Sequence, residues 1–368
     1  MPANEVRQAI ARNIARYRKS LRLSQERLAE RAGVSRQSII NYEQAKTLPD
    51  SRTLSTVARA LEVAMDDLLT NGLTLPTFRF RAHASFAPKA QFAAQMISLL
   101  EDYTALEQAA GVVPYTPESA PCYRLAGNEG HIREAASRFR RRLGLEEGPI
   151  PNLFEASEAI GLKILRKPVH VKGFFGLSAY SPDQGAFVLI NNNATIERQI
   201  FTLAHEIGHL ILHRADYKES LLPGRRDVEH EREAVAHYFA SHLLVSENAL
   251  KHALLIKRNI LELKKYFRVS YTMVLKRLSD IGLLHYGDAI RRLRAEYRKQ
   301  TGSPLTGDIE LPPALSVEDF PENERFIGLI WRALELGKIS EMRAAEQLNV
   351  TITDLRKSSQ LAWSTAHI

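Results

Sequence analysis

Residues 201–213, FTLAHEIGHLILH, place histidine and glutamate side chains inside a run of apolar residues. The apolar pattern predicts a buried helix that begins near Ile196. Burying an ionisable group is costly unless the group is hydrogen-bonded, paired or bound to a metal ion. The polar residues of this segment are therefore either ordinary side chains at the edge of a core or the ligands of a metal.

The spacing of the polar residues favours the metal. His205 and His209 are four residues apart and share one helix face, so both rings can bind one zinc ion. Glu206 lies about 100° around the helix from His205, near enough to hold a water molecule at the metal and act as general base. Gly208 lowers helix propensity by about 1 kcal/mol but opens room beside the metal. The alternative is a buried, hydrogen-bonded pair of histidines.

A catalytic zinc ion needs three protein ligands and one open position, so a third ligand comes from elsewhere. The chain has one cysteine, Cys122, and it is remote in sequence. The segment EREAVAHYFASHLL supplies Glu233 as the expected third ligand, with Glu229 as a fallback. His237 lies one turn beyond Glu233, where it supports a ligand or touches the substrate.

Composition sets broad limits on the class of protein. A length of 368 residues predicts two or three domains, and a formal charge of +8 permits contact with an acidic polymer. The N-terminus carries charges where a signal peptide has an apolar core, and no apolar run reaches the roughly 20 residues that span a bilayer. A cytoplasmic protein without a membrane partner is the expectation.

The N-terminal segment has the features of a helix–turn–helix that binds double-stranded DNA. Ser24 and Ser35 can cap two short helices, and Gly33 allows the turn between them. The second helix presents polar residues that can pair with base edges, while its neighbours contact phosphates. The expected DNA-contacting residues are Gln25, Ser35, Arg36, Gln37, Ser38, Asn41 and Lys46.

This segment, LSQERLAERAGVSRQSIINYEQAKTLPDSRTLSTVARALEV, resembles the Cro/C1-type (XRE) helix–turn–helix family over about residues 6–69. The resemblance implies a five-helix domain that acts on operator DNA, often as a homodimer on palindromic sites. A protein-binding helical bundle is the alternative, which the gathering of polar residues on one helix disfavours.

The centre of the chain resembles the ImmA/IrrE family of metallopeptidases over roughly residues 125–250. The matching pieces include GLSAY, VLINNN, ERQIFTLAHEIGHLILH and EREAVAHYFASHLLVS. If the roles of the family's motif residues apply to the matching positions, the resemblance implies that His205, His209 and Glu233 are the zinc ligands and that Glu206 is the general base. The run LLVS departs from the Leu-Leu-Met-Pro-like end that members of the family share, which changes a turn and leaves the ligands intact.

The expected activity is a zinc-dependent endopeptidase that cleaves a repressor or an antitoxin-like protein. Zinc lowers the pKa of water toward neutrality, and Glu206 carries the proton to the leaving nitrogen. His237, His230 and Tyr238 are open candidates for the oxyanion donor. The strand AFVLI, residues 186–190, is expected to pair with an extended substrate. The alternative is a regulator or an antitoxin whose zincin-like domain senses a ligand or partner without cutting.

The expected fold is mainly α. It comprises a helix–turn–helix domain at 1–70, a connector with a helix at 71–120, an α+β zincin-like metallopeptidase domain with a small sheet at 121–300 and a helical module at 301–368. Ser340 and the residues after it faintly resemble a second helix–turn–helix, although a docking module is favoured. His213, His230 and His242 have no assigned partner and are expected at the surface.

Overall fold

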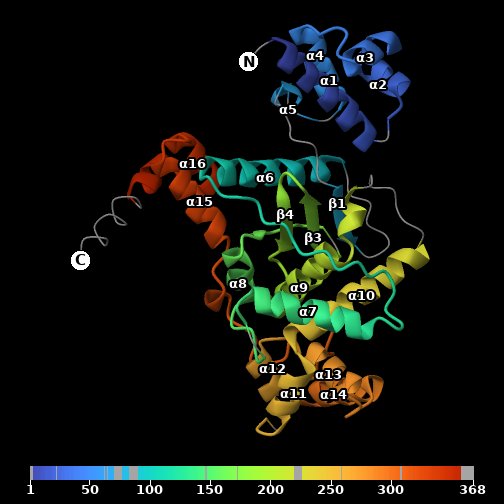
Figure 1. Ribbon diagram of the computed structural model, residues 1–368, viewed down its shortest axis with the longest axis vertical. Coiled ribbons are helices and arrows are strands. Elements are labelled where there is room, and N and C mark those ends of the chain that lie inside the picture. The colour runs from blue at the N-terminus through green and yellow to red at the C-terminus, as the bar shows by residue number, and fades with distance from the viewer. Residues whose placement is uncertain are drawn as a thin grey trace. The chain divides into compact units, whose positions relative to one another are not determined.

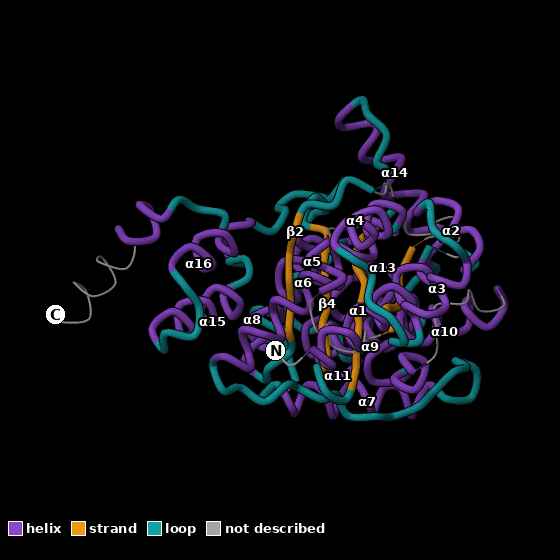
Figure 2. Tube along the Cα trace, turned by 90° about the horizontal axis from the view of Figure 1, so that it is seen from above, coloured by secondary structure: helices purple, strands orange, loops and turns teal. Residues whose placement is uncertain are grey.

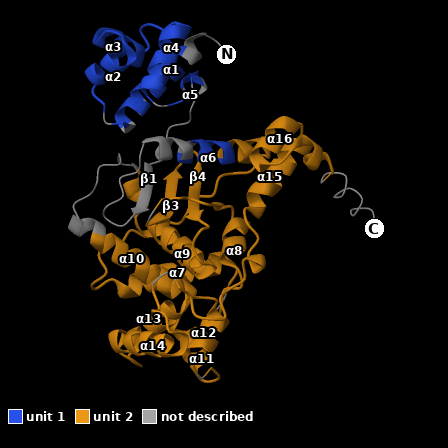
Figure 3. Cartoon of the chain, turned by 180° about the vertical axis from the view of Figure 1, so that it is seen from behind, with its two compact units in different colours: residues 1–75, 87–103 blue, residues 76–86, 104–368 orange. Residues whose placement is uncertain are grey.

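A computed structural model describes residues 3–21, 23–61, 63, 65–69, 77–82, 90–145, 147–171, 173–218, 226–257, 259–306 and 309–357. The chain divides into two compact units, residues 1–75 with 87–103 and residues 76–86 with 104–368 (Figure 3). The fold is mainly α, as predicted. The division into four parts stays a prediction.

The N-terminal unit begins with the five predicted helices, α1 (Ala3–Ser20), α2 (Gln25–Ala32), α3 (Arg36–Glu43), α4 (Ser51–Ala60) and α5 (Met65–Leu69). Their core includes Ile14, Leu28, Ile39 and Val57, each fully buried. The sequence features that end and begin the helices act as expected. Gly33 adopts a φ of 68°, a left-handed conformation that favours glycine, and stops α2.

The second unit contains a four-stranded sheet in the order β1-β3-β4-β2 (Figure 1). Its strands are β1 (Thr77–Ala82), β2 (Lys163–Lys167), β3 (Phe174–Ser181) and β4 (Gly185–Asn191). β4 pairs antiparallel with β3 and parallel with β2, and Figure 2 shows β2 and β4 side by side. Because β4 is paired on both sides, the prediction that residues 186–190 receive a substrate strand is wrong.

Helices α9 (Ile196–Leu212) and α10 (Arg226–Leu244) form the layers that carry the predicted metal ligands. α9 packs against β3 and β4, and α10 packs against both α9 and α7 (Glu129–Arg142) (Figure 1). A Cβ atom at Gly208 would lie 3.0 Å from Phe239 and 3.4 Å from Ala236, both on α10. The space that Gly208 leaves is therefore filled by α10 rather than left open beside a metal.

The remaining elements belong to the second unit, except that the first of them begins in the first unit, which includes residues 87–103. They are α6 (Ala90–Ala109), α8 (Leu153–Ala159), η1 (Arg214–Lys218), α11 (Glu247–Leu254), α12 (Ile260–Phe267), α13 (Tyr271–Asp280), α14 (Tyr286–Thr301), η2 (Val317–Asp319), α15 (Glu324–Glu335) and α16 (Glu341–Leu348). The predicted C-terminal helices are thus present.

Three segments of the described chain share one helix–turn–helix geometry. Each first helix ends at a residue of left-handed conformation, namely Gly33, Arg268 and Asn349, with φ of 68°, 54° and 54°. A valine follows in each case, and its N–H donates to the carbonyl five residues earlier. Each second helix is then capped by Ser35, Ser270 or Thr351, whose hydroxyl accepts the N–H three residues later. The backbone turn at residues 349–351, after α16, is therefore closer to the first one than the faint sequence resemblance indicates.

Replacing Gly176 on β3 with alanine should destabilise the second unit. The added Cβ would lie 2.6 Å from Thr202 Cγ2 on α9 and 2.9 Å from the backbone carbonyl of Leu189 on β4. Overpacking of this kind costs about 1–3 kcal/mol. Urea denaturation measures the loss. The matched control is Gly328→Ala in α15, where an added Cβ has nothing within 4 Å and helix propensity should add up to about 1 kcal/mol. Equal effects of the two substitutions would contradict the close packing of β3 on α9.

Candidate metal centre and DNA-contacting face

Three potential ligand atoms from α9 and α10 converge at one point. The Nε2 atoms of His205 and His209 are 2.9 Å apart. The carboxylate of Glu233 lies 3.4 Å from Nε2 of His205 and 3.2 Å from Nε2 of His209. Both histidines are buried, whereas the Glu233 side chain keeps 27% of its exposure. The structure therefore brings together the three residues that the sequence predicts as ligands.

The spacing of these atoms fits a zinc ion. Zinc binds imidazole nitrogen and carboxylate oxygen at about 2.0–2.2 Å in tetrahedral geometry, which separates neighbouring ligand atoms by about 3.4 Å. The observed separations of 2.9, 3.2 and 3.4 Å match that triangle closely. Two imidazoles and one carboxylate are also the donor set that catalytic zinc sites use.

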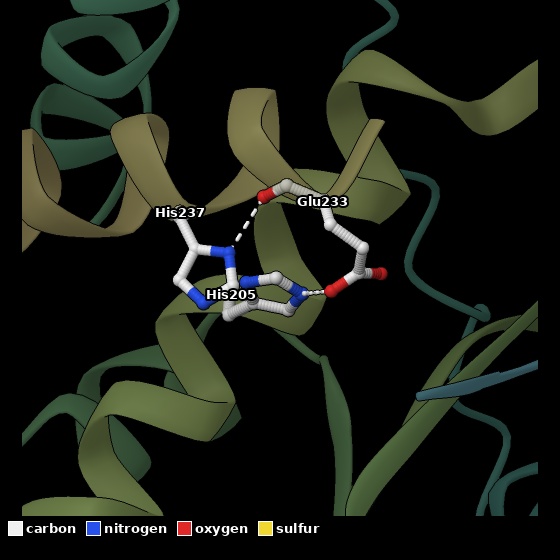
Figure 4. A group of neighbouring side chains, drawn as sticks. All are labelled: His205, Glu233 and His237. Carbon is white, nitrogen blue, oxygen red and sulfur yellow. Dashed lines mark hydrogen bonds and ion pairs between the residues drawn. The ribbon is translucent and has the colours of Figure 1, made fainter. Parts of the chain in front are cut away.

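His237 lies beside this group and offers a second set of three. Ligand atoms of His205, Glu233 and His237 lie within 4.8 Å of one another (Figure 4). The Nδ1 atom of His237 donates to the backbone carbonyl of Glu233 at 2.7 Å, which leaves Nε2 to face the group. We favour the set with His209, because its atoms are closer together and its rings are buried while His237 is exposed.

His213 lies beside a candidate ligand, and the prediction that it is at the surface is wrong. It is fully buried, and its Nδ1 lies 2.9 Å from Nδ1 of His209. If the Nδ1–H of His209 donates to His213, the Nε2 of His209 keeps its lone pair for a metal. The sequence contains a feature that predicts this contact, because His213 follows His209 at the same four-residue spacing. His242 is likewise buried and not at the surface, whereas His230 is exposed as predicted.

Glu206 is fully buried and is held by a chain of hydroxyl groups. Ser178 on β3 donates to Glu206 Oε2 at 2.5 Å. Since the Ser178 proton is used there, the Tyr217 hydroxyl on η1 donates to Ser178 Oγ at 2.7 Å. The sequence reading missed both residues, because the contacts join segments 28 and 39 residues apart. The chain of hydrogen bonds fixes the orientation of the Glu206 carboxylate.

Local electrostatics keep Glu233 ionised. Burial raises the pKa of its carboxyl group, but hydrogen bonds and charge interactions with His205 and His209 outweigh burial and lower the pKa well below its ordinary value. An ionised carboxylate beside imidazole rings is the form in which these groups bind a divalent metal. The fallback ligand Glu229 lies on α10, but its side chain is outside the described residues.

The predicted DNA-contacting residues gather at the start of α2 and along α3. Arg36, Gln37 and Lys46 are exposed, as a groove-facing position requires. Gln37 donates to Asn41 at 3.1 Å, which orders the two amides on one face of α3.

The other predicted contacts have partners within the domain. Ser35 accepts the backbone N–H of Ser38 as a helix cap, and the two hydroxyl groups are 2.8 Å apart. Gln25 donates to Glu43, which also binds Arg18. Gln25 would have to exchange this bond for one to a phosphate.

The geometry defines a two-part protein, with a helix–turn–helix and a helix-borne His-Glu-x-x-His site. Comparison with known families agrees. Residues 14–68 match the family model described as helix-turn-helix, and residues 157–279 match the one described as IrrE N-terminal-like domain. The chain thus carries a helix–turn–helix domain followed by an ImmA/IrrE-like, peptidase-like domain.

Solved structures add only distant similarity. A Mycobacterium tuberculosis transcriptional regulator is 16% identical, with 49% of this chain and 51% of that chain covered at a TM-score of 0.31. The alignment therefore spans about half of that regulator. Bacillus thuringiensis PlcR, solved with the peptide PapR7 and DNA, is 11% identical, with 98% and 96% covered at a TM-score of 0.18. The competence regulator ComR from Streptococcus vestibularis is 11% identical, with 97% and 98% covered at 0.17. No curated protein matches the chain. No described helix is long and apolar enough to cross a bilayer.

His242 should make stability fall in mild acid. Burial, and secondarily the Arg277 guanidinium, lower the pKa of His242 to about 4 from an ordinary value of 6.5. Between these two values the unfolded chain binds a proton that the folded chain does not, so the free energy of unfolding decreases as pH falls, by up to about 3 kcal/mol. Urea denaturation at pH 7 and pH 4.5 should show a smaller decrease for His242→Gln than for wild type. The exposed His285 serves as control, and His285→Gln should keep the wild-type decrease. Equal decreases in all three proteins would contradict this assignment.

Proposed function

We propose that the chain is a cytoplasmic transcriptional regulator whose second unit is a zinc-dependent endopeptidase that cleaves a repressor or an antitoxin-like protein. The convergence of His205, His209 and Glu233 on a point beside α9 carries the proposal. The three residues come from two helices, and their separations fit zinc. A purely structural site would not need the Glu206 carboxylate next to it.

The chain's own residues supply the proton chemistry. When bound to His205, His209 and Glu233, zinc would act as a Lewis acid that polarises a peptide carbonyl and acidifies water. Glu206 accepts a proton from the attacking water and delivers it to the leaving nitrogen. Ser178 and Tyr217 hold its carboxylate in one orientation during both transfers.

The mechanism also needs a hydrogen-bond donor to the oxyanion that forms from the peptide carbonyl. Tyr238 accepts a hydrogen bond from Arg133 at 2.9 Å and its ring lies against His242, which holds its hydroxyl group beside Arg133 of α7. His237 lies against His205 with ring centroids 4.6 Å apart, and because its Nδ1 donates to the Glu233 carbonyl, its Nε2 can donate when the ring is protonated. We therefore assign the donor to His237 in preference to Tyr238 and His230.

The first unit would bind operator DNA through α3. Arg36 can pair with guanine, and Gln37 and Asn41 can pair with adenine. Gln25 and Lys46 would contact phosphates, and the capping hydroxyls of Ser35 and Ser38 lie at the same helix end. A homodimer on a palindromic operator is the arrangement that the family resemblance implies.

Substitutions in the two units should have separable effects. Glu206→Gln should lower cleavage of a candidate repressor by at least a hundredfold, because it removes the general base, while operator binding stays unchanged. Arg36→Ala should weaken operator binding by about 1–3 kcal/mol and leave cleavage unchanged. Gel-shift titration and electrophoresis of the cleaved repressor measure the two activities.

Cleavage by neither wild type nor Glu206→Gln, across repressors and antitoxins encoded nearby, would favour a non-proteolytic regulator or antitoxin whose zincin-like domain senses a ligand. The opposite pattern of effects would overturn the assignment of roles to the two units.

Zinc affinity should depend on His213 as well as on the ligands. Loss of a residue that orients a metal-bound histidine lowers affinity about 10–100-fold, and His213→Ala should do so by freeing the His209 ring. Competition with a chromophoric chelator measures the zinc affinity, and His285→Ala should leave it unchanged. His209→Ala and Glu233→Ala should lower it further than His213→Ala. A loss for His237→Ala as large as that for His209→Ala would instead support the ligand set that contains His237.

A further inference from the structure

The sheet of the second unit has two edges, and one of them is closed by a side chain. β2 forms that edge, and Asn323 lies against it. The Asn323 carbonyl oxygen accepts from the backbone N–H of Arg166 at 2.7 Å, and its amide donates to the backbone carbonyl of the same residue at 3.1 Å. Asn323 thus makes the pair of bonds that a neighbouring strand would make. An extended chain cannot add at this point of β2 without breaking both.

The strand next to the other edge of the sheet lies beside the candidate catalytic residues. It is β3, which pairs with β4 on one side and with the edge strand β1 on its outer side, and its Ser178 holds the Glu206 carboxylate. β3 also lies tightly on α9, because an added Cβ at Gly176 would clash with Thr202. A polypeptide paired with β3 would therefore pass directly beside the Ser178–Glu206 pair.

In this structure another strand of the same chain covers the outer side of β3. β1 (Thr77–Ala82) pairs antiparallel with β3, and Arg79 stands opposite Ser178. The register shifts between Arg81 and Ala82, so the pairing is interrupted at the end of the strand. β1 comes from the sequence between the helix–turn–helix and the residues that match the IrrE-like family, 157–279. The strand beside the site is thus contributed by a segment that precedes the peptidase-like domain.

We propose that the outer edge of β3 is the binding surface for an extended segment of a protein substrate, and that β1 occupies it in competition with that segment. This inference rests on the proposed function for the identity of the partner as a substrate. Strand addition draws its affinity from main-chain hydrogen bonds, so the partner is an unfolded or loop segment rather than a helix. The apparent affinity of the segment falls with the fraction of molecules in which β1 is on the edge.

A binding experiment tests the proposal without requiring cleavage. Neighbouring residues of a strand point their N–H groups to opposite sides, so the double substitution Arg79→Pro/Phe80→Pro must remove at least one hydrogen bond to β3. The matched control, Arg79→Lys/Phe80→Tyr, keeps both N–H groups and strand propensity. Both are made in the full chain with Glu206→Gln, so that the probe stays intact. The probe is a fluorescein-labelled synthetic peptide with the sequence of residues 76–83, PTFRFRAH, followed by fluorescence anisotropy.

The peptide should bind the proline variant at least tenfold more tightly than the control variant, because the edge is open. A peptide with proline at both positions that correspond to Arg79 and Phe80 should bind neither variant. Equal affinity of PTFRFRAH for the two variants would overturn the proposal. Since no step requires hydrolysis, this outcome is distinct from a failure of the proposed peptidase, which the repressor cleavage assay reports.

Hydrogen exchange of the wild-type chain provides a second test if the proline variant does not fold. Excess unlabelled PTFRFRAH should speed exchange of the amides in residues 77–82 at least threefold, because the peptide displaces β1. A peptide of the same composition in scrambled order with a central proline should leave the rate unchanged. An identical exchange rate with and without PTFRFRAH would contradict competition for the edge.

Discussion

Two helices can direct side chains at one metal ion only where their backbones come close together, and α9 and α10 do so at Gly208. This glycine lies between His205 and His209, and the α10 residue facing it, Ala236, lies between Glu233 and His237. A side chain at Gly208 would meet α10 at 3.0–3.4 Å, so a larger residue would push the carboxylate away from the two rings. The candidate metal centre therefore depends on a packing contact between residues that do not themselves bind the metal.

One buried ion pair and neighbouring hydrogen bonds fix the first turn of α9. Glu197 near its N-terminus accepts from Lys264 at 3.0 Å and from the backbone N–H of Leu315 at 2.9 Å. Two residues further on, the neutral Gln199 accepts from Arg166 of β2. These charges are almost completely buried, and burial of a charge is tolerated only with partners of this kind. Breaking one would leave an unpaired buried charge at the start of the helix that carries the site.

The sequence predicts the parts of the site that are local. A four-residue spacing places His205 and His209 on one face whatever the tertiary structure, and a cap, a glycine and a second cap specify the turn before α3. Ser178 and Tyr217 could not be predicted in this way, because their roles arise from contacts between a strand, a helix and a 3-10 turn. The position of β4 inside the sheet is also non-local, since β2 reaches it only by a parallel crossover and β1 comes from distant sequence.

The three helix–turn–helix segments show why the motif alone does not specify DNA binding. The turn depends on a left-handed residue and a capping hydroxyl, and neither determines what the second helix contacts. In α13 the residues that follow the cap include Tyr271 and Leu275, which are 2% and 0% exposed and pack against Ile290 of α14. That helix cannot enter a groove. After Thr351 the chain presents Ile352 where the first segment has Arg36. Base recognition therefore requires the polar and basic face of α3, and the same backbone turn serves internal packing in α13.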